Sequence, residues 1–115
     1  MEIVCSTDSK YIMPTGIMLT SLFESNRGEV VNVHLLHNHD SAALLDPIRT
    51  IAARYQQNIH FYLINDDIFK HFPIGLDFQV DHVGTSFATC YRLYLTEILP
   101  ADIDKVIYLD GDILV

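Results

Sequence analysis

The sequence is short of positive charge, and this shortage restricts the partners that the chain can bind. Its 115 residues include 7 Lys and Arg against 15 Asp and Glu, which gives a formal net charge of −8. A protein that binds the phosphate backbone of nucleic acids needs a basic face, so we predict no nucleic-acid partner. An anionic ligand would need local help from a metal ion, a helix N-terminus or a well-placed arginine.

Targeting signals, membrane spans and motif cysteines are lacking as well. The first ten residues, MEIVCSTDSK, hold no basic segment followed by a long apolar run, so they are not a signal peptide. No apolar stretch approaches the roughly 20 residues that a transmembrane helix needs. Cys5 and Cys90 have no CxxC or similar spacing. This pattern favours two reduced thiols in the core of a cytoplasmic protein.

Short β-rich runs alternate with helical patterns, without internal repeats or a Pro/Gly-rich linker. Because parallel strands need crossover connections, the alternation predicts one α/β domain whose mainly parallel sheet is covered by helices on both faces. The predicted strands are 2–6, 30–36, 58–64 and 105–110, and the predicted helices are 13–25, 41–55, 66–72 and 86–99. The last helix is apolar almost all round, and the last strand is apolar on both faces, so both are predicted to be buried.

Pro47 interrupts the helical pattern of residues 41–55. It either bends one helix or begins a new one, with Asp46 as the N-cap and Pro47 as the first helical residue. Ser41 is a candidate N-cap for the beginning of the segment.

Three polar segments follow predicted strands: STDSKY at 6–11, HNHD at 37–40 and DGD at 110–112. The strands of a parallel sheet end at the same edge, and ligands of such sheets gather there. We therefore expect these segments to form the ligand-binding edge of the domain.

The segment Asp110-Gly111-Asp112 interrupts an apolar run, so it is a candidate metal site. In extended backbone, residues i and i+2 project to the same side, so both carboxylates can face one ion. Hard oxygen ligands suit Mg²⁺ or Mn²⁺, and Gly111 lets a ligand approach the backbone closely. The alternative is a solvated turn, because Asp-Gly is also a turn signal.

The histidines His34, His37 and His39 suggest a second metal site, but the pattern is weak. His37 and His39 can share a face, yet no cysteine or carboxylate supplies the ligand spacing of a closed zinc site.

Three blocks of the sequence, EIVCSTDSKY, FATCYRLYLTEILP and DKVIYLDGDILV, resemble glycosyltransferase family 8 in their order and spacing. The resemblance implies a Rossmann-like nucleotide-diphospho-sugar transferase fold, of which this chain is the N-terminal, nucleotide-binding portion. It also implies metal-dependent transfer of a hexose, with retention, from UDP-glucose or UDP-galactose to a hydroxyl of a saccharide or lipid-linked saccharide acceptor.

The resemblance implies roles for individual residues. Asp110 and Asp112 match the pair that holds Mn²⁺ (or Mg²⁺) against the UDP diphosphate, and Gly111 between them joins the nucleotide-sugar site. Uridine contacts are implied for the first loop, through Thr7, Asp8 and Tyr11. Arg92 matches an arginine that faces the sugar and phosphates of the donor. No catalytic residue is assigned.

The residues themselves also allow other roles for three of these positions. Without the resemblance, the residue types favour an Asx-turn or cap role for Asp8 and a place in the core for Tyr11. Arg92 has no acidic partner at i±3 or i±4, so it needs either a distant carboxylate or a ligand phosphate.

The apolar run that ends at Val115 predicts a domain truncated just after its D-x-D motif, with residues 1–115 as the front part of an enzyme. An exposed terminal strand would let the chain self-associate. We expect the third metal ligand and the acceptor site beyond Val115, with segments there making peripheral contact with the inner membrane face. Two other functions remain open: a Mg²⁺-dependent phosphotransferase of the haloacid-dehalogenase type and a non-catalytic nucleotide-sugar-binding module.

Overall fold

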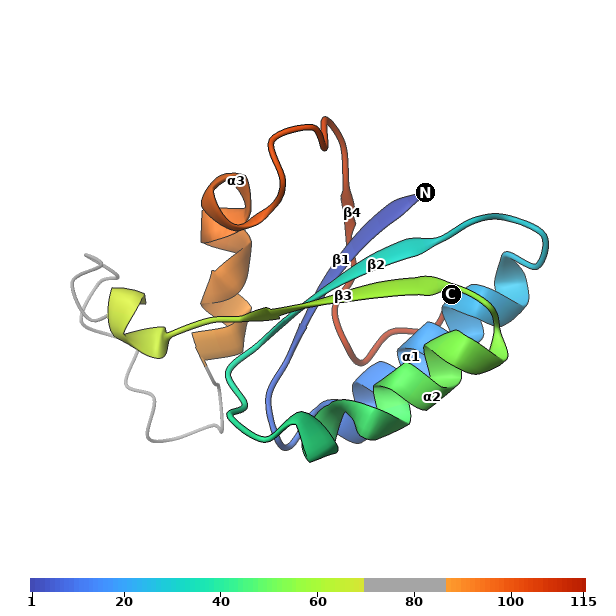
Figure 1. The fold of residues 1–115 in the computed structure, drawn as a ribbon, viewed down its shortest axis with the longest axis horizontal. Coiled ribbons are helices and arrows are strands. Elements are labelled where there is room, and N and C mark those ends of the chain that lie inside the picture. The colour runs from blue at the N-terminus through green and yellow to red at the C-terminus, as the bar shows by residue number, and fades with distance from the viewer. Residues whose placement is uncertain (70–86) are drawn as a thin grey trace.

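A parallel four-stranded sheet forms the centre of the molecule (Figure 1). The computed structural model describes residues 1–69 and 87–115. The strands β1 (Glu2–Thr7), β2 (Asn32–His37), β3 (Asn58–Leu63) and β4 (Ile107–Tyr108) lie in the order β3-β2-β1-β4, and each pair of neighbours is parallel. This arrangement confirms the predicted α/β fold with a parallel sheet.

Helical segments connect the strands. The first is α1 (Ile12–Ser25), between β1 and β2. The 3₁₀ segment η1 (Ala42–Leu45) and the helix α2 (Asp46–Arg54) lie between β2 and β3. Two further 3₁₀ segments, η2 (Asp66–Phe69) and η3 (Phe87–Tyr94), precede the short helix α3 (Leu95–Ile98) and β4.

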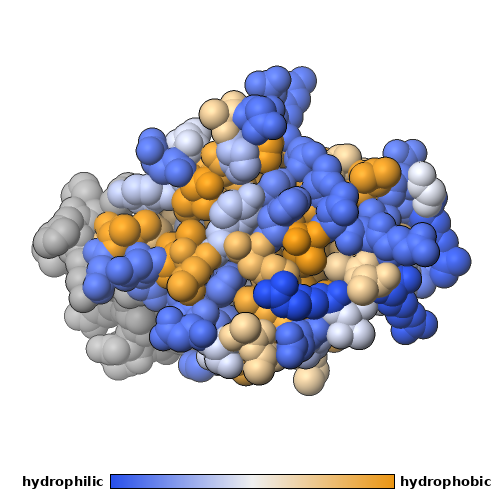
Figure 2. Space-filling view, viewed as in Figure 1, coloured by the Kyte–Doolittle hydropathy of each residue, from blue (hydrophilic) through white to orange (hydrophobic). Residues whose placement is uncertain are grey.

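The two faces of the sheet carry different layers. Ile3 and Cys5 of β1 join α1 and α2 in one core cluster, whereas Val4 joins Cys90 and Tyr91 of η3 in the other. Alternate residues of a strand point to opposite faces, so β1, whose residues 3–5 are buried, packs against both layers. Figure 1 shows α1 and α2 on one side and α3 on the other, and Figure 2 shows apolar side chains interspersed with polar ones on the face in view.

In the connection between β2 and β3 a new helix begins just before Pro47, so Pro47 does not bend a longer helix. A 3₁₀ turn ends at Leu45, and α2 then starts at Asp46, so Asp46 and Pro47 are its first two residues, one position later in the helix than predicted. Ser41 occupies the predicted N-cap position, directly before η1. Its hydroxyl makes no capping hydrogen bond, so the predicted capping interaction is wrong.

The segment predicted as an α-helix over 86–99 is instead mainly 3₁₀ in its described part, which begins at Phe87. Three residues per turn place Ala88, Tyr91 and Tyr94 on one side and Thr89 and Arg92 on another. Ala88 and Tyr91 are buried and Arg92 is exposed, so the prediction of an all-round buried helix was wrong. The helix predicted at 66–72 is η2 over its first four residues, and the remainder lies outside the described residues.

The last strand is shorter and more open than predicted. Only Ile107 and Tyr108 pair with β1, and the Leu109 N–H continues the contact by donating to the Val4 carbonyl at 2.8 Å. Within the described sheet β4 lies at an edge, and Ile107 is 52% exposed. The prediction of a strand over 105–110 that is buried on both faces was therefore wrong.

Both cysteines are free thiols in the core, as predicted. Burial raises the pKa of Cys5 to about 12, so this thiol stays protonated near neutral pH. Within residues 1–69 and 87–115, none of the helices combines the length and apolarity needed to cross a membrane.

Asp66 links η3 to the rest of the domain. The Tyr91 hydroxyl donates to its Oδ1 at 2.5 Å, and the Asn38 amide donates to its Oδ2 at 3.0 Å. Phe69 stacks on the Tyr91 ring with centroids 5.6 Å apart. Desolvation, followed by the bond to Asp66, raises the pKa of Tyr91 far above its usual value. These contacts fix the segment that carries Arg92.

We predict that Tyr91→Phe lowers the free energy of unfolding by about 2 kcal/mol, because it removes a hydrogen bond to a charged group and leaves Asp66 with one partner fewer. Urea unfolding measures the change. Tyr11→Phe is the matched control, since Tyr11 is 43% exposed. Equal stabilities of the two variants would show that the Asp66 link contributes little.

Candidate functional site

The strand order identifies the crevice in which a ligand would bind. The chain moves outward from β1 to β2 and β3, and then returns to β4 on the other side of β1. In open parallel sheets, ligands bind at the carboxyl ends of the strands where the order reverses in this way. That point lies between the ends of β1 and β4, so the segments STDSKY and DGD flank it.

The first of these segments is held by Asp8. Its Oδ1 accepts hydrogen bonds from the backbone N–H groups of Lys10 at 2.8 Å and Tyr11 at 3.1 Å. Asp8 thus forms the Asx-turn that was one of its two predicted roles, and a uridine contact would have to use its second oxygen. Tyr11 is 43% exposed, so its placement in the core was wrong, and its ring is open to a ligand.

Thr7 is buried, and its hydroxyl already has partners within the protein. The Thr15 hydroxyl donates to it at 3.1 Å, and it donates to the Asp8 carbonyl at 3.2 Å. Thr15, which sequence reasoning did not single out, therefore ties the first turn of α1 to the end of β1.

Gly111 lies directly against this Thr7–Thr15 pair. A Cβ on residue 111 would be 2.7 Å from the Thr15 Oγ1 and 3.5 Å from the Ser6 carbonyl oxygen. Real Cβ atoms do not approach an oxygen that closely, so the D-x-D turn needs glycine here to pack against β1 and α1. Gly111 was predicted to admit a ligand, whereas the close approach in the structure is to the protein itself.

We predict that Gly111→Ala destabilises the chain by about 1–3 kcal/mol, because the added methyl group must displace a buried hydroxyl. In the double variant Gly111→Ala/Thr15→Ala, the oxygen is absent, so the loss should be smaller than the sum of the two single losses. Chemical unfolding of the four proteins measures this coupling. If the two single losses of stability simply add in the double variant, the contact is contradicted. Thr15→Ser keeps the hydroxyl, so it should not reduce the loss caused by Gly111→Ala.

The D-x-D segment is a solvated turn rather than part of an extended buried strand. Gly111 and Asp112 lie in a turn, both aspartates are exposed, and the backbone of 113–115 leaves the sheet. The Ser21 and Ser25 hydroxyls donate to the backbone oxygen of Val115 at 2.7 and 2.8 Å, which lays this run along α1. Burial of the carboxylates was therefore the wrong reason for expecting a metal, although their role as ligands remains a prediction.

Arg92 contacts one of these carboxylates. Its Nη2 lies 3.0 Å from the Asp110 Oδ1, and its Nε donates to the Thr89 carbonyl at 3.1 Å. The guanidinium carbon is 4.7 Å from the centre of the Tyr108 ring, whose hydroxyl is 2.7 Å from the Ser6 hydroxyl. The distant carboxylate that Arg92 required is thus Asp110, itself a predicted site residue. Tyr108 was missed, although it lies two residues before Asp110.

The histidines make different contacts from those of a zinc site. His34 is buried, with Nε2 at 2.7 Å from Glu2 Oε2 and Nδ1 at 2.9 Å from the Tyr62 hydroxyl. His37 Nδ1 accepts from the His39 N–H at 3.3 Å, so neutral His37 carries its proton on Nε2. Burial, helped by His39, lowers the pKa of His37. Among the described residues, no group of three or more His, Cys, Asp or Glu side chains is arranged to hold a metal ion.

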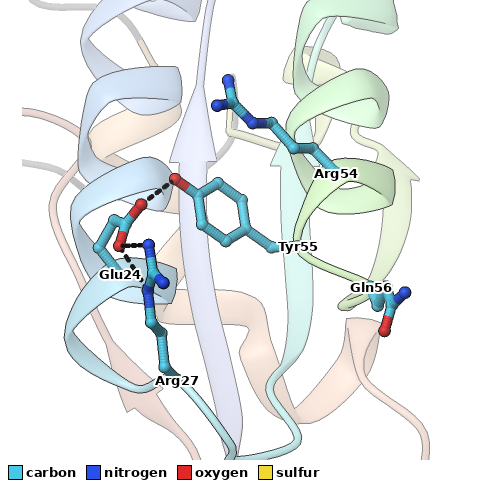
Figure 3. Close-up of a pocket in the computed structure, with 5 residues that line it drawn as sticks. All are labelled: Glu24, Arg27, Arg54, Tyr55 and Gln56. Carbon is cyan, nitrogen blue, oxygen red and sulfur yellow. Dashed lines mark hydrogen bonds and ion pairs between the residues drawn. The ribbon is translucent and has the colours of Figure 1, made fainter.

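A polar hollow of about 320 Å³ lies where α1 and α2 end, away from the carboxyl edge of the sheet (Figure 3). The Tyr55 hydroxyl donates to Glu24 at 2.6 Å, and Arg27 Nη2 is 2.6 Å from the same carboxylate. Arg54 and Gln56 complete the lining. Exposed ion pairs of this kind are solvated and contribute little to stability.

Comparison with known proteins identifies the class. The profile described as glycosyl transferase family 8 matches residues 2–115. A lipopolysaccharide 1,2-glucosyltransferase of Escherichia coli is 25% identical over 107 residues, which cover 93% of this chain and 30% of that protein. The lipopolysaccharide glucosyltransferase WaaO of E. coli strain K12 is 25% identical over 117 residues, covering 99% of this chain and 32% of the relative.

The solved structures agree. The crystal structure of the galactosyltransferase LgtC in complex with donor and acceptor sugar analogs superimposes with a TM-score of 0.79 at 30% identity, over 100% of this chain and 39% of that one. The bifunctional glycosyltransferase WbbM, at 18% identity and a TM-score of 0.68 over 96% of this chain and 18% of that one, shares the fold. The chain belongs to glycosyl transferase family 8, and it spans about a third of the length of the curated relatives it matches.

Proposed function

We propose that this chain is the nucleotide-sugar-binding part of a glycosyltransferase that moves a hexose from a UDP-sugar to a hydroxyl of a saccharide or lipid-linked saccharide. The observation that carries the proposal is the family match over residues 2–115. The first loop, Arg92 and the D-x-D turn lie at the carboxyl edge of the sheet beside β1 and β4, which supports it. Similarity to lipopolysaccharide glucosyltransferases and to a galactosyltransferase supports glucose or galactose as the sugar.

The residues of the D-x-D turn fit a hard divalent cation. Asp110 and Asp112 offer exposed carboxylate oxygens, the ligands that Mn²⁺ and Mg²⁺ prefer, and the open turn leaves positions for diphosphate oxygens. When bound, such an ion stabilises the negative charge that develops on the departing UDP. Retention of the anomeric configuration is part of the proposal on the strength of family membership.

The other residues of the site bind and orient the donor. The exposed ring of Tyr11 can stack on the uracil, and the second carboxylate oxygen of Asp8 can accept its N–H while Oδ1 keeps the loop folded. Arg92 is close enough to Asp110 to reach phosphates bound there. Transfer itself is assigned to the whole protein, and donor binding to this chain. The family match does not support a phosphotransferase of the haloacid-dehalogenase type.

We expect Asp110→Asn/Asp112→Asn to abolish Mn²⁺-dependent UDP binding in calorimetry, because both charged ligands are lost. The chain contains a matched control, since Asp102 and Asp104 form a second, exposed D-x-D pair. Asp102→Asn/Asp104→Asn changes the net charge equally and should leave binding unaltered. Metal-dependent heat that persists in the first variant would refute the assignment.

Nucleotide selectivity tests the first loop. In Mn²⁺, UDP should raise the melting temperature more than ADP or GDP does, and at 100 times its Kd it should add about 2.7 kcal/mol of stability. Asp8→Asn keeps the side-chain oxygen that caps the loop but replaces the second oxygen with an N–H donor, so it should remove the preference for UDP. Equal shifts for all three nucleotides in the wild-type chain would exclude a base-specific role for Asp8 and Tyr11.

A further inference from the structure

We propose that Arg92 occupies the cation position of the ligand-free site and exchanges its partner when the ligands bind. In the structure its guanidinium group lies beside Asp110 and over Tyr108, at the position where positive charge can neutralise the D-x-D turn. As a divalent cation takes Asp110, Arg92 turns to the phosphates of the nucleotide. Metal and nucleotide diphosphate therefore bind cooperatively. The inference rests on the proposed function and adds an order of events to it.

The contacts of Arg92 suit such an exchange. Its Nε bond to Thr89 holds the base of the guanidinium group, while Nη2 alone reaches Asp110. The side chains of Arg92 and Asp110 are 43% and 57% exposed, so their ion pair is weak and can open at small cost. A buried ion pair is costly to break because its charges cannot be solvated separately, whereas both side chains of this pair reach solvent.

Electrostatics then predicts the sign of the coupling. A divalent ion that binds Asp110 without nucleotide meets a guanidinium group already on that carboxylate, and the two positive charges repel each other. With a diphosphate present, Arg92 has a new anionic partner, so the repulsion becomes an attraction. By linkage, the nucleotide must strengthen metal binding by the same factor as the metal strengthens nucleotide binding, and we expect at least tenfold.

The test measures free Mn²⁺ by electron paramagnetic resonance for the 115-residue chain, with and without saturating UDP. Arg92→Gln should bind Mn²⁺ alone three- to tenfold more tightly than the wild type does, and the factor by which UDP improves binding should fall by at least threefold. Arg54→Gln removes one positive charge in the distant hollow of Figure 3 and should leave both values within twofold of wild type.

Two results would overturn the inference. If Arg92→Gln weakens or does not change Mn²⁺ binding in the absence of UDP, Arg92 does not compete with the ion. If the wild type binds UDP and Mn²⁺ without cooperativity, there is no exchange of partners. Failure of the wild type to bind them at all would instead refute the proposed function, and the inference with it. If Arg92→Gln does not fold, Arg92→Lys is tested instead. Lysine keeps the charge but lacks the planar guanidinium group, so the factor by which UDP improves Mn²⁺ binding should fall. An unchanged factor would contradict the exchange.

Discussion

The position of β1 in the middle of the sheet is the constraint on which the rest of the structure depends. It pairs with β2 on one side and β4 on the other, and Ile3, Val4 and Cys5 are at most 1% exposed. Because its side chains alternate between the two faces, the same strand supports α1 and α2 on one face and η3 on the other. Its carboxyl end also determines where the first loop and the D-x-D turn meet.

That meeting point is held by short contacts around Gly111, Thr15 and Thr7, so the turn is placed by packing against β1 and α1. The groups predicted to bind ligand lie at its open side, where the carboxylates and Tyr11 reach solvent. A rigid inner side and an exposed outer side are what a site for a charged, dissociable ligand requires. Arg92 places a positive charge beside Asp110 of this turn, and the proposed exchange of partners rests on that contact.

The parallel sheet could be predicted because β-branched and apolar runs alternate with helical patterns, and β1, α1 and β3 lie within two residues of their predicted bounds. The 3₁₀ conformation of η3 could not be predicted. An apolar run predicts burial, but it does not distinguish three residues per turn from 3.6, and the bond between Tyr91 and Asp66 connects residues 25 positions apart. The Arg92–Asp110 contact could not be predicted either, because it joins residues far apart in the sequence. The sequence showed only that no acidic residue lies one helical turn from Arg92. A solvated turn at 110–112 was one of two predicted alternatives. The apolar residues on both sides favoured the other, an extended segment next to a buried strand, because sequence does not show that 113–115 run along α1.

The claim at the centre of this account is that the crevice between β1 and β4 binds a nucleotide diphosphate together with a divalent ion. Paramagnetic broadening by Mn²⁺ in nitrogen-15 spectra of the chain, recorded with UDP present, locates the ion without reference to catalysis. The account predicts broadening centred on residues 110–112, extending to 7–11 and to the Arg92 side chain, and sparing residues 24–27 and 54–56 at the far end of the helices. Broadening spread evenly over the acidic surface, or centred on Asp102 and Asp104, would contradict it.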